Sequence, residues 1–180
     1  MSHVGAAARS PFFRGRHRYA TSADPARHDV RANRPGARAA SLADRFFDSI
    51  TCMHLIEHLT TVTNLWREIA RVLKPAGRVY IETPGPESVR TRSAPNELRG
   101  KVTLNFFDDP THVLPVTREV MASAAREHGL IPAKSGKSRN WIFAASYPFF
   151  ALLPARRQRY VAKLHWLGWS VYLIARKPAA

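Results

Sequence analysis

Apolar and polar positions alternate most regularly between residues 47 and 84, and the pattern predicts a strand, a helix and a second strand. The run Phe47 to Met53 has strand length, and the run Arg78 to Thr83 alternates apolar with polar residues. Between them, apolar residues recur at spacings of three and four, which predicts one helix with a continuous apolar face: Val62, Leu65, Trp66, Ile69, Ala70, Val72 and Leu73. Two strands joined by one helix predict a right-handed parallel crossover.

Local signals mark both ends of this predicted helix. Thr61 is the expected N-cap, because its hydroxyl can accept from a first-turn amide that lacks a helical partner. Lys74 falls where the helix dipole favours a cation. Pro75 and Gly77 are expected to end the helix and to turn the chain toward the second strand.

A long loop follows, because residues 85–116 contain four prolines and no clear periodicity. A loop of this length in a compact domain is usually a lid or a binding loop. Thr117 then predicts the start of a helix that ends at Gly129, and a weak strand is expected from Leu130 to Ser138. Val116 and Met121 are expected to form a hydrophobic staple, and the inner face of the helix is predicted to be Val120, Met121, Ala124 and His128.

Residues 139–167 form two apolar and basic segments. The first, Trp141 to Leu153, is interrupted by Pro148, and its thirteen residues fall short of the roughly twenty that span a bilayer. The second, Ala155 to Leu167, has a helical pattern. Over residues 139–172, aromatic side chains stand beside four cations, Arg156, Arg157, Arg159 and Lys163, a pattern typical of a helix at an anionic membrane surface. The competing interpretation is a helical cap whose aromatic side chains pack on the sheet.

The formal net charge of +15 lies entirely at the two ends of the chain. Residues 1–45 carry nine Arg and three Asp, residues 46–127 are neutral, and residues 128–180 carry nine basic residues and no acid. Basic ends favour an anionic partner, such as phospholipid, a phosphate-bearing glycan or nucleic acid. The alternative is a solvated basic surface. Nucleic acid is the weakest of these partners, because no nucleic-acid-binding motif accompanies the arginines.

Residues 1–41 are rich in Arg, Ala, Ser and Pro and show no periodicity, so this segment is expected to be disordered and the domain to occupy residues 42–180. The segment lacks the apolar run of a secretory signal. Its composition resembles a transit peptide, although Asp24 and Asp29 weaken that alternative. The single cysteine, Cys52, allows no disulfide within one chain, which favours a reducing compartment such as the cytoplasm and a buried, apolar role for the thiol.

One acidic motif raises the question of a metal. Asp108 and Asp109 stand close to His112, but no second histidine or cysteine has ligand spacing to them, so no metal site is predicted. The alternatives for this motif are a histidine that lines a pocket and a turn whose backbone is set by Asp109 and Pro110.

The same stretches resemble the second half of the class I S-adenosylmethionine-dependent methyltransferases, in particular the type 11 and type 23 methyltransferase domains. The matching positions are Phe47-Asp48, Ile56-Glu57-His58, Arg71 to Gly77 with Ala76 in place of a glycine, Asn105 to Val113, and Gly168 to Pro178. Each motif is degenerate alone, but their order and spacing make the match fairly specific. The resemblance covers Leu42 to Pro178.

This resemblance implies an α/β fold, a truncated Rossmann-like sheet with the family's strands in the order 4-5-7-6 and the last strand antiparallel. Before Phe47 we find neither the family's first three strands nor its Gly-rich cofactor turn. The chain is therefore expected to be a fragment or a degenerate relative that binds S-adenosylmethionine weakly. Strand 47–53 would become an exposed edge through which the chain could self-associate.

The resemblance also implies site residues. Cys52, Met53 and His54 would line the amino-acid and sulfonium end of the cofactor. Glu57 and His58 would lie on the first turns that lead into the helix over residues 62–73, with His58 as a general base. His112 would lie in the loop over the substrate. The alternative for Glu57 and His58 is a structural role.

For function, these features favour a methyltransferase that acts on a small molecule or a glycan-linked metabolite. The other hypothesis is a catalytically dead remnant that serves as a binding module at an anionic surface.

Overall fold

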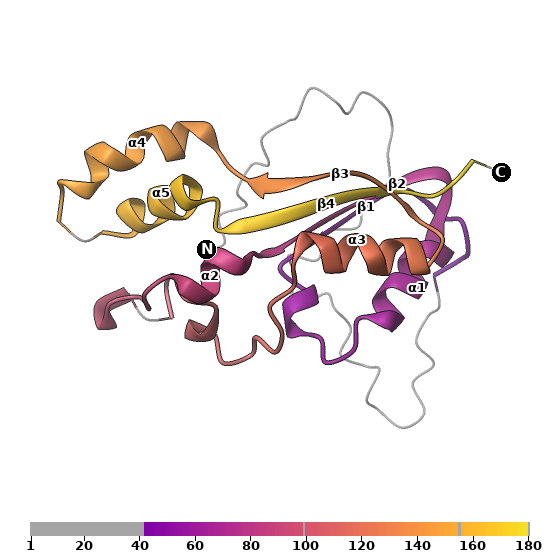
Figure 1. Ribbon diagram of the computed structural model, residues 1–180, viewed down its shortest axis with the longest axis horizontal. Helices are drawn as coiled ribbons and strands as arrows, with labels where there is room; N and C mark the ends of the chain where they lie inside the picture. The colour runs from indigo at the N-terminus through magenta and orange to yellow at the C-terminus, as the bar shows by residue number, and fades with distance from the viewer. Residues whose placement is uncertain (1–41, 99, 155, 180) are drawn as a thin grey trace, which may run out of the picture.

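The computed structural model describes residues 42–98, 100–154 and 156–179 (Figure 1). Four strands form one sheet: β1 (Phe47–Met53), β2 (Leu73–Pro84), β3 (Ile131–Ser138) and β4 (Ser170–Arg176). Their order in the sheet is β1-β2-β4-β3; β1 and β2 are parallel, and β4 is antiparallel to both of its neighbours. This arrangement confirms the predicted order 4-5-7-6 with an antiparallel last strand. Residues 1–41, for which we predicted disorder, lie outside the described part of the chain.

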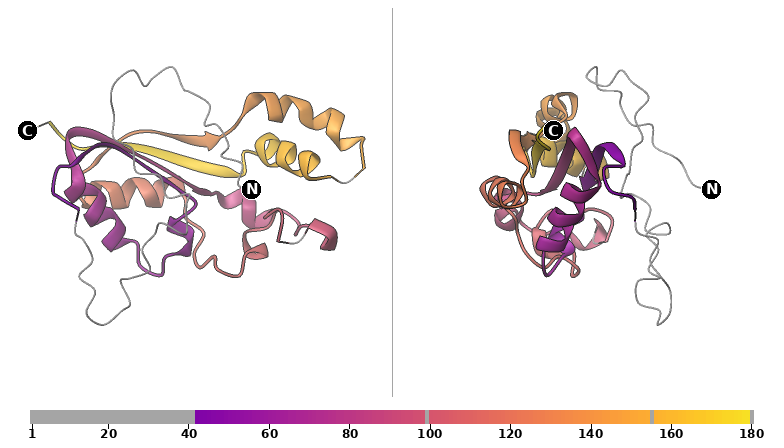
Figure 2. Two further views of the ribbon diagram at one scale, coloured as in Figure 1. Left: turned by 180° about the vertical axis from the view of Figure 1, so that it is seen from behind. Right: turned by 90° about the vertical axis from the view of Figure 1, so that its right-hand side faces the viewer.

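Helices α1 (Thr63–Val72) and α3 (Arg118–Glu127) pack on one face of the sheet (Figures 1 and 2). Trp66 of α1 and Met121 of α3 are fully buried, and they meet sheet residues such as Ile81 and Leu173 in one core. Alternation along β1, β2 and β4 sends one row of side chains into this core, which is why the apolar pattern predicts these strands correctly.

The crossover from β1 to β2 differs from the prediction at its ends. The N-cap of α1 is Val62, without a side-chain hydrogen bond, and not Thr61. The strand β2 begins at Leu73, where a helical residue was expected, because the chain is already paired there with Phe47. Residues 74–77 bulge out of the pairing, with Ala76 at φ 60°, and the Lys74 ammonium holds the bulge by binding Asp48 at 2.9 Å.

Helix α3 begins as predicted. The Thr117 hydroxyl accepts from the Val120 amide, and Val116 and Met121 are both buried. The predicted inner face is wrong at Val120, which is 52% exposed, because the buried stripe runs through Met121 and Ala125 instead.

Four short elements and one hairpin complete the described chain. Besides helix α2 (Pro86–Arg90), the loop regions hold the 3-10 turns Ile56–His58, Asn96–Leu98 and Phe106–Asp108. The hairpin consists of α4 (Trp141–Ala151) and α5 (Arg157–Leu167), and it extends beyond one end of the sheet (Figure 1). The predicted interruption at Pro148 is wrong, because α4 continues through this residue.

Among the described residues, only β2 pairs with β1, so β1 is the edge of the sheet that we expected. Self-association through this edge stays a prediction. No helix within the described part of the chain is long and apolar enough to cross a membrane.

Candidate functional site

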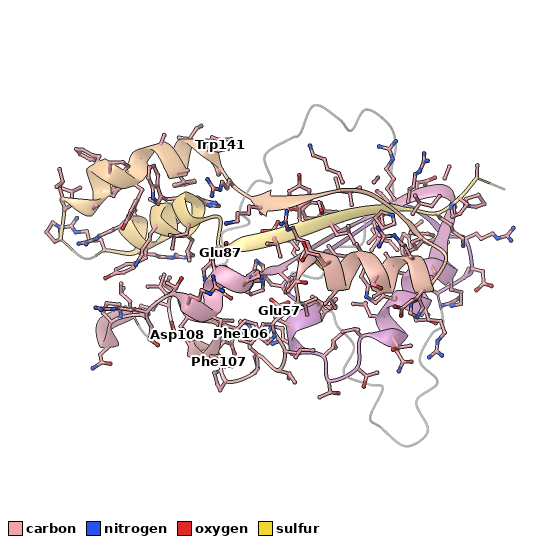
Figure 3. The ribbon with its side chains drawn as sticks, viewed as in Figure 1. Glu57, Glu87, Phe106, Phe107, Asp108 and Trp141 are labelled. Carbon is pink, nitrogen blue, oxygen red and sulfur yellow. The ribbon has the colours of Figure 1, made fainter. Side chains whose placement is uncertain are left out.

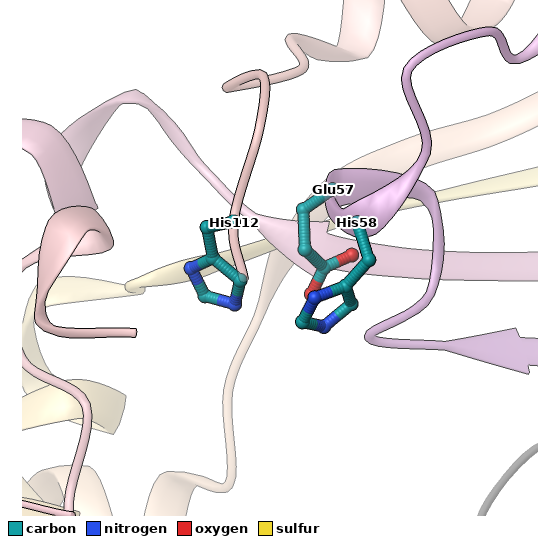
Figure 4. Close-up of side chains that lie close together, drawn as sticks. All are labelled: Glu57, His58 and His112. Atoms are coloured by element: carbon teal, nitrogen blue, oxygen red, sulfur yellow. The ribbon is translucent and has the colours of Figure 1, made fainter. Parts of the chain in front are cut away.

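The site lies at the end of the sheet where the parallel strands β1 and β2 finish. Ligands of open α/β sheets bind at this end of the strands. The 3-10 turn Ile56–His58 follows β1 here, and the loop that contains His112 joins it through backbone hydrogen bonds. The amides of Val113 and Leu114 donate to the Glu57 carbonyl oxygen at 2.8 and 3.4 Å. This join places the rings of His58 and His112 with their centroids 4.8 Å apart (Figure 4).

The hydrogen bonds of His112 fix its tautomer. Its Nδ1 lies 2.7 Å from the carbonyl oxygen of Phe106, which can only accept, so Nδ1 carries a proton. In the neutral ring, Nε2 therefore keeps a lone pair. The nearest carboxylate oxygen of Asp109 lies 3.8 Å from Nε2, too far for a hydrogen bond but close enough to stabilise the ring once Nε2 gains a proton.

The same reasoning applies to His58. Its Nδ1 lies 3.2 Å from the Thr111 carbonyl oxygen and 2.9 Å from the Thr111 hydroxyl oxygen. That hydroxyl donates its own hydrogen to Asp109 at 2.6 Å, so it can only accept from His58. Nδ1 of His58 thus carries a proton, and Nε2 of the neutral ring is again the basic atom.

Asp109 stays ionised beside the two rings. The hydrogen bonds from the Thr111 hydroxyl and amide lower the pKa of Asp109 below its ordinary value, and the nearby histidines act in the same direction. The carboxylate therefore supplies a fixed negative charge next to His112, and Thr111 connects this charge to His58.

Glu57 is the buried centre of the site. Its side chain is fully buried, and its carboxylate accepts from the Thr83 hydroxyl at 3.1 Å and lies 3.1 Å from Nδ1 of His54. Burial raises the pKa of Glu57, but the hydrogen bonds from His54 and Thr83 outweigh it and lower the pKa overall. Burial lowers the pKa of His54, yet the hydrogen bond and charge of Glu57, helped by Glu82, raise it overall. Glu57 thus holds the turn after β1 against the end of β2.

Glu57, His58 and His112 each place a ligand atom within 4.8 Å of the others (Figure 4). The prediction of no metal rested on the lack of a second histidine at ligand spacing, and the fold supplies that histidine from a distant segment. Both oxygens of Glu57 are already engaged with His54 and Thr83. The two Nε2 atoms are therefore the groups left for chemistry.

The three predicted cofactor residues differ in their surroundings. The Cys52 side chain lies in the hydrophobic core, so only its backbone is left for binding. Met53 is 45% exposed, and the imidazole of His54 is 42% exposed while it holds Glu57. Met53 and His54 therefore form the accessible surface after β1.

A cavity of about 320 Å³ opens beside the histidines. The imidazoles of His54, His58 and His112 lie on one side of it, and Val161 and Leu164 of α5 lie on another. Trp169 completes the wall, and its indole N–H donates to the Leu104 carbonyl at 2.6 Å, which joins the start of β4 to the long loop. Lys101 and Arg157 bring positive charge to the lining, and Asp109 brings one negative charge beside the histidines. The site thus combines an apolar wall, basic imidazoles, two cations and one carboxylate.

Asp108 has a structural role in the long loop (Figure 3). One of its oxygens accepts from the backbone amides of Ala94, Leu104 and Asn105, at distances between 2.9 and 3.1 Å. The Asn105 side chain accepts in turn from the Phe107 amide. Asn105 and Asp108 thus form a reciprocal capping box at the start of the 3-10 turn Phe106–Asp108. This network orders the loop that carries His112.

Sequence reasoning named His58 and His112 separately but missed the residues that orient them. Asp109 was considered only as part of an acidic motif or a turn, Thr111 was given no role, and Thr83 was treated only as a strand residue. The single signal available was the motif itself, a carboxylate and a hydroxyl immediately before a histidine. The contact with His58 is invisible in the sequence, because the two segments are far apart in the chain.

Comparison with known proteins shows similarity to methyltransferases. Residues 15–81 match a family model described as a methyltransferase domain, a match that begins upstream of the region in which we find the resemblance. Over 37 residues the chain is 43% identical to the ubiquinone biosynthesis O-methyltransferase of Xanthomonas oryzae pv. oryzae, covering 21% of this chain and 16% of that protein. The same enzyme of Xanthomonas euvesicatoria pv. vesicatoria is 34% identical over 55 residues, covering 31% and 19%.

Two solved structures show the same fold. One is from the Haloferax volcanii complex of the Trm112 methyltransferase activator with a methyltransferase, with a TM-score of 0.54, 17% identity, and coverage of 78% of this chain and 58% of that one. The other is an S-adenosylmethionine-dependent methyltransferase from Mesorhizobium loti, with a TM-score of 0.50, 14% identity, and coverage of 77% and 65%. The chain thus spans less than two thirds of each of these relatives.

Proposed function

We propose that the chain is a class I S-adenosylmethionine-dependent methyltransferase and that its described residues form the acceptor side of a site for methyl transfer to a hydroxyl oxygen. The observation that carries this proposal is the fixed tautomer of His112. Its Nδ1 proton is committed to the Phe106 carbonyl, so Nε2 is free to take a proton at the cavity wall.

The residues after β1 fit one wall of the cofactor site. Met53 and His54 are exposed at the carboxyl end of β1, where the family places the amino-acid end of the cofactor, and the Cys52 backbone continues that surface. S-adenosylmethionine, when bound, supplies the electrophilic methyl group. The described residues contain no Gly-rich turn for its nucleotide half.

The proton step uses the chain's own groups. A hydroxyl of the acceptor donates to Nε2 of His112, and its proton passes to this nitrogen as the oxygen becomes nucleophilic. The charged ring is then stabilised by the Asp109 carboxylate, which lies 3.8 Å from Nε2. His58 lies beside it with its own Nε2 unprotonated, and Thr111 holds the ring in place. We therefore assign His112 as the base and His58 as a second acceptor of hydrogen bonds.

The cavity lining favours a small, largely apolar acceptor with an anionic substituent. Val161, Leu164 and Trp169 suit an aromatic or aliphatic body, and Lys101 and Arg157 suit a carboxylate or phosphate. The names of the curated relatives, O-methyltransferases of ubiquinone biosynthesis, support oxygen as the atom that is methylated. A small hydroxylated aromatic acid is thus the acceptor class that we propose.

The test is methyl transfer to 3,4-dihydroxybenzoate by the full chain at saturating, radiolabelled S-adenosylmethionine. We expect His112→Ala to lower the rate by about 100-fold or more, the usual contribution of a positioned base. His128→Ala is the matched control, because this histidine also binds a backbone carbonyl through Nδ1 but lies at the end of α3. Full activity of His112→Ala would refute the assigned base. An absence of transfer by the full chain would favour the alternative of a binding module without catalysis.

A further inference from the structure

Helix α4 is apolar around its whole circumference, yet it is not buried. Its sequence WIFAASYPFFA has no charged residue, and Ala144 is its single fully buried residue. A helix that is apolar on all sides normally lies inside a protein or in a membrane. The exposure is large for Trp141 (71%), Ile142 (81%) and Phe149 (65%), and it continues into the following turn at Leu152 (86%). This surface, which we call the hairpin surface, runs along α4 into the following turn and comprises Trp141, Ile142, Phe149, Leu152 and Leu153.

The partner helix α5 is what holds α4 in place. The rings of Phe143 and His165 stack at 5.5 Å, and Tyr147 lies 5.9 Å from Trp166. Ala144 and Ala162 are buried between the helices. Figure 3 shows Trp141 at the start of α4, the end of the helix next to β3, and its side chain is 71% exposed. The earlier alternative, in which these aromatics cap the sheet, is therefore wrong for Trp141 and Phe149.

Every charged residue of the α4–α5 hairpin itself is basic, and Glu87 of α2 lines a pocket with Lys163. Arg156 and Arg157 are exposed, Arg159 and Lys163 are half-exposed, and residues 128–180 contain no Asp or Glu. The guanidinium of Arg139 lies 5.5 Å from the centre of the Trp141 ring. Apolar and aromatic side chains beside cations, with no acid in the hairpin itself, match the interface of an anionic bilayer. A purely apolar protein partner would leave these cations without counter-charges.

We propose that the α4–α5 hairpin docks the protein on the surface of an anionic phospholipid bilayer. The eleven residues of α4 can lie in the interface but are too few to span it. The hairpin connects the end of β3 to the start of β4, at the same end of the sheet where β1 and β2 finish. Three residues of α5 also line the cavity: Arg157, Val161 and Leu164. Docking therefore places the cavity close to the membrane. If the proposed function holds, an amphiphilic acceptor could then enter the cavity from the membrane.

The test is flotation of the full chain with vesicles of pure phosphatidylcholine and with vesicles that also contain phosphatidylglycerol. We expect binding to the anionic vesicles, weakened by salt, and little binding to the neutral ones. The variant Trp141→Ser/Ile142→Ser/Leu152→Ser should lose binding while keeping its circular dichroism. Phe107→Ser is the matched control, because Phe107 is 63% exposed but lies outside the hairpin. Arg156→Gln should weaken binding about fivefold at low salt.

Three outcomes would overturn the proposal: equal binding to both vesicles, no binding to either, or full binding by the triple variant. Dimerisation that the triple variant abolishes, without any lipid binding, would assign the hairpin surface to a second copy of the chain. The readout needs neither cofactor nor acceptor, so its failure is distinguishable from a failure of the proposed methyl transfer.

Discussion

The Thr83 hydroxyl donates to the Glu57 carboxylate across 3.1 Å, and both side chains are fully buried. This bond joins the end of β2 to the turn after β1, at the edge of the sheet where the site lies. A buried carboxylate that loses a donor is left partly unsatisfied, and hydrogen bonds to charged groups contribute more than neutral ones.

Replacing Thr83 with Val, which keeps the shape of the side chain, should lower the free energy of unfolding by about 2 kcal/mol. Thr51→Val, on the opposite face of the sheet, is the control and should cost much less. Urea titration of both variants measures the difference. Equal stabilities for the two variants would contradict the role that we give to Glu57.

The ion pair between His54 and Glu57 predicts a stability that depends on pH. The pKa of Glu57 is lowered from 4.5, so its contribution is complete above pH 4.5 and is lost as pH falls through the lowered pKa. The pKa of His54 is raised from 6.5, so its contribution is complete below pH 6.5 and is lost as pH rises through the raised pKa.

The pair should therefore stabilise the fold most between pH 4.5 and 6.5. We expect the stability difference between the natural chain and His54→Gln to peak in this range and to shrink on both sides. The effect should be modest, since the His54 ring is 42% exposed and solvent screens it. His128→Gln is the control for the change of residue type. A difference that does not vary with pH would argue against the pairing.

Asp108 should be the most sensitive residue of the long loop, because one carboxylate oxygen organises three backbone amides. We expect Asp108→Ala to cost about 3 kcal/mol, since three buried or half-buried donors lose an ionised acceptor. Hydrogen exchange should also speed up at Ala94, Leu104 and Asn105. Glu119→Ala, an exposed acid in the first turn of α3, is the control. Unchanged exchange at these three amides would exclude the proposed anchoring.

Cys52 should not react while the protein is folded. Burial, assisted by the negative charge of Glu57, raises the pKa of Cys52 to about 12, so the reactive thiolate is scarce at neutral pH. We expect no labelling by iodoacetamide at pH 8 in the native state and rapid labelling in urea. Mass spectrometry of the intact chain distinguishes the two. Fast labelling of native protein would show that β1 opens readily.

The elements of this fold are set by local sequence patterns. The apolar spacing of three and four over residues 62–73 predicts α1, and alternation predicts the inner rows of the strands. The Thr117 cap follows from a hydroxyl at the right position, because a cap depends on neighbours within one turn. The order of motifs gave the family and, through it, the order of the strands.

Tertiary structure decided what those patterns do not contain. Leu73 becomes a strand residue because Phe47 pairs with it, and Val120 faces solvent because the sheet covers a neighbouring stripe of α3. His58 and His112 are brought together by the amides that bind the Glu57 carbonyl, a contact between segments more than fifty residues apart. Composition shows that α4 is apolar, but only the packing shows that α5 covers one side of it and leaves Trp141 exposed. Burial depends on which surfaces the folded chain brings into contact, and the sequence of α4 alone does not contain that information.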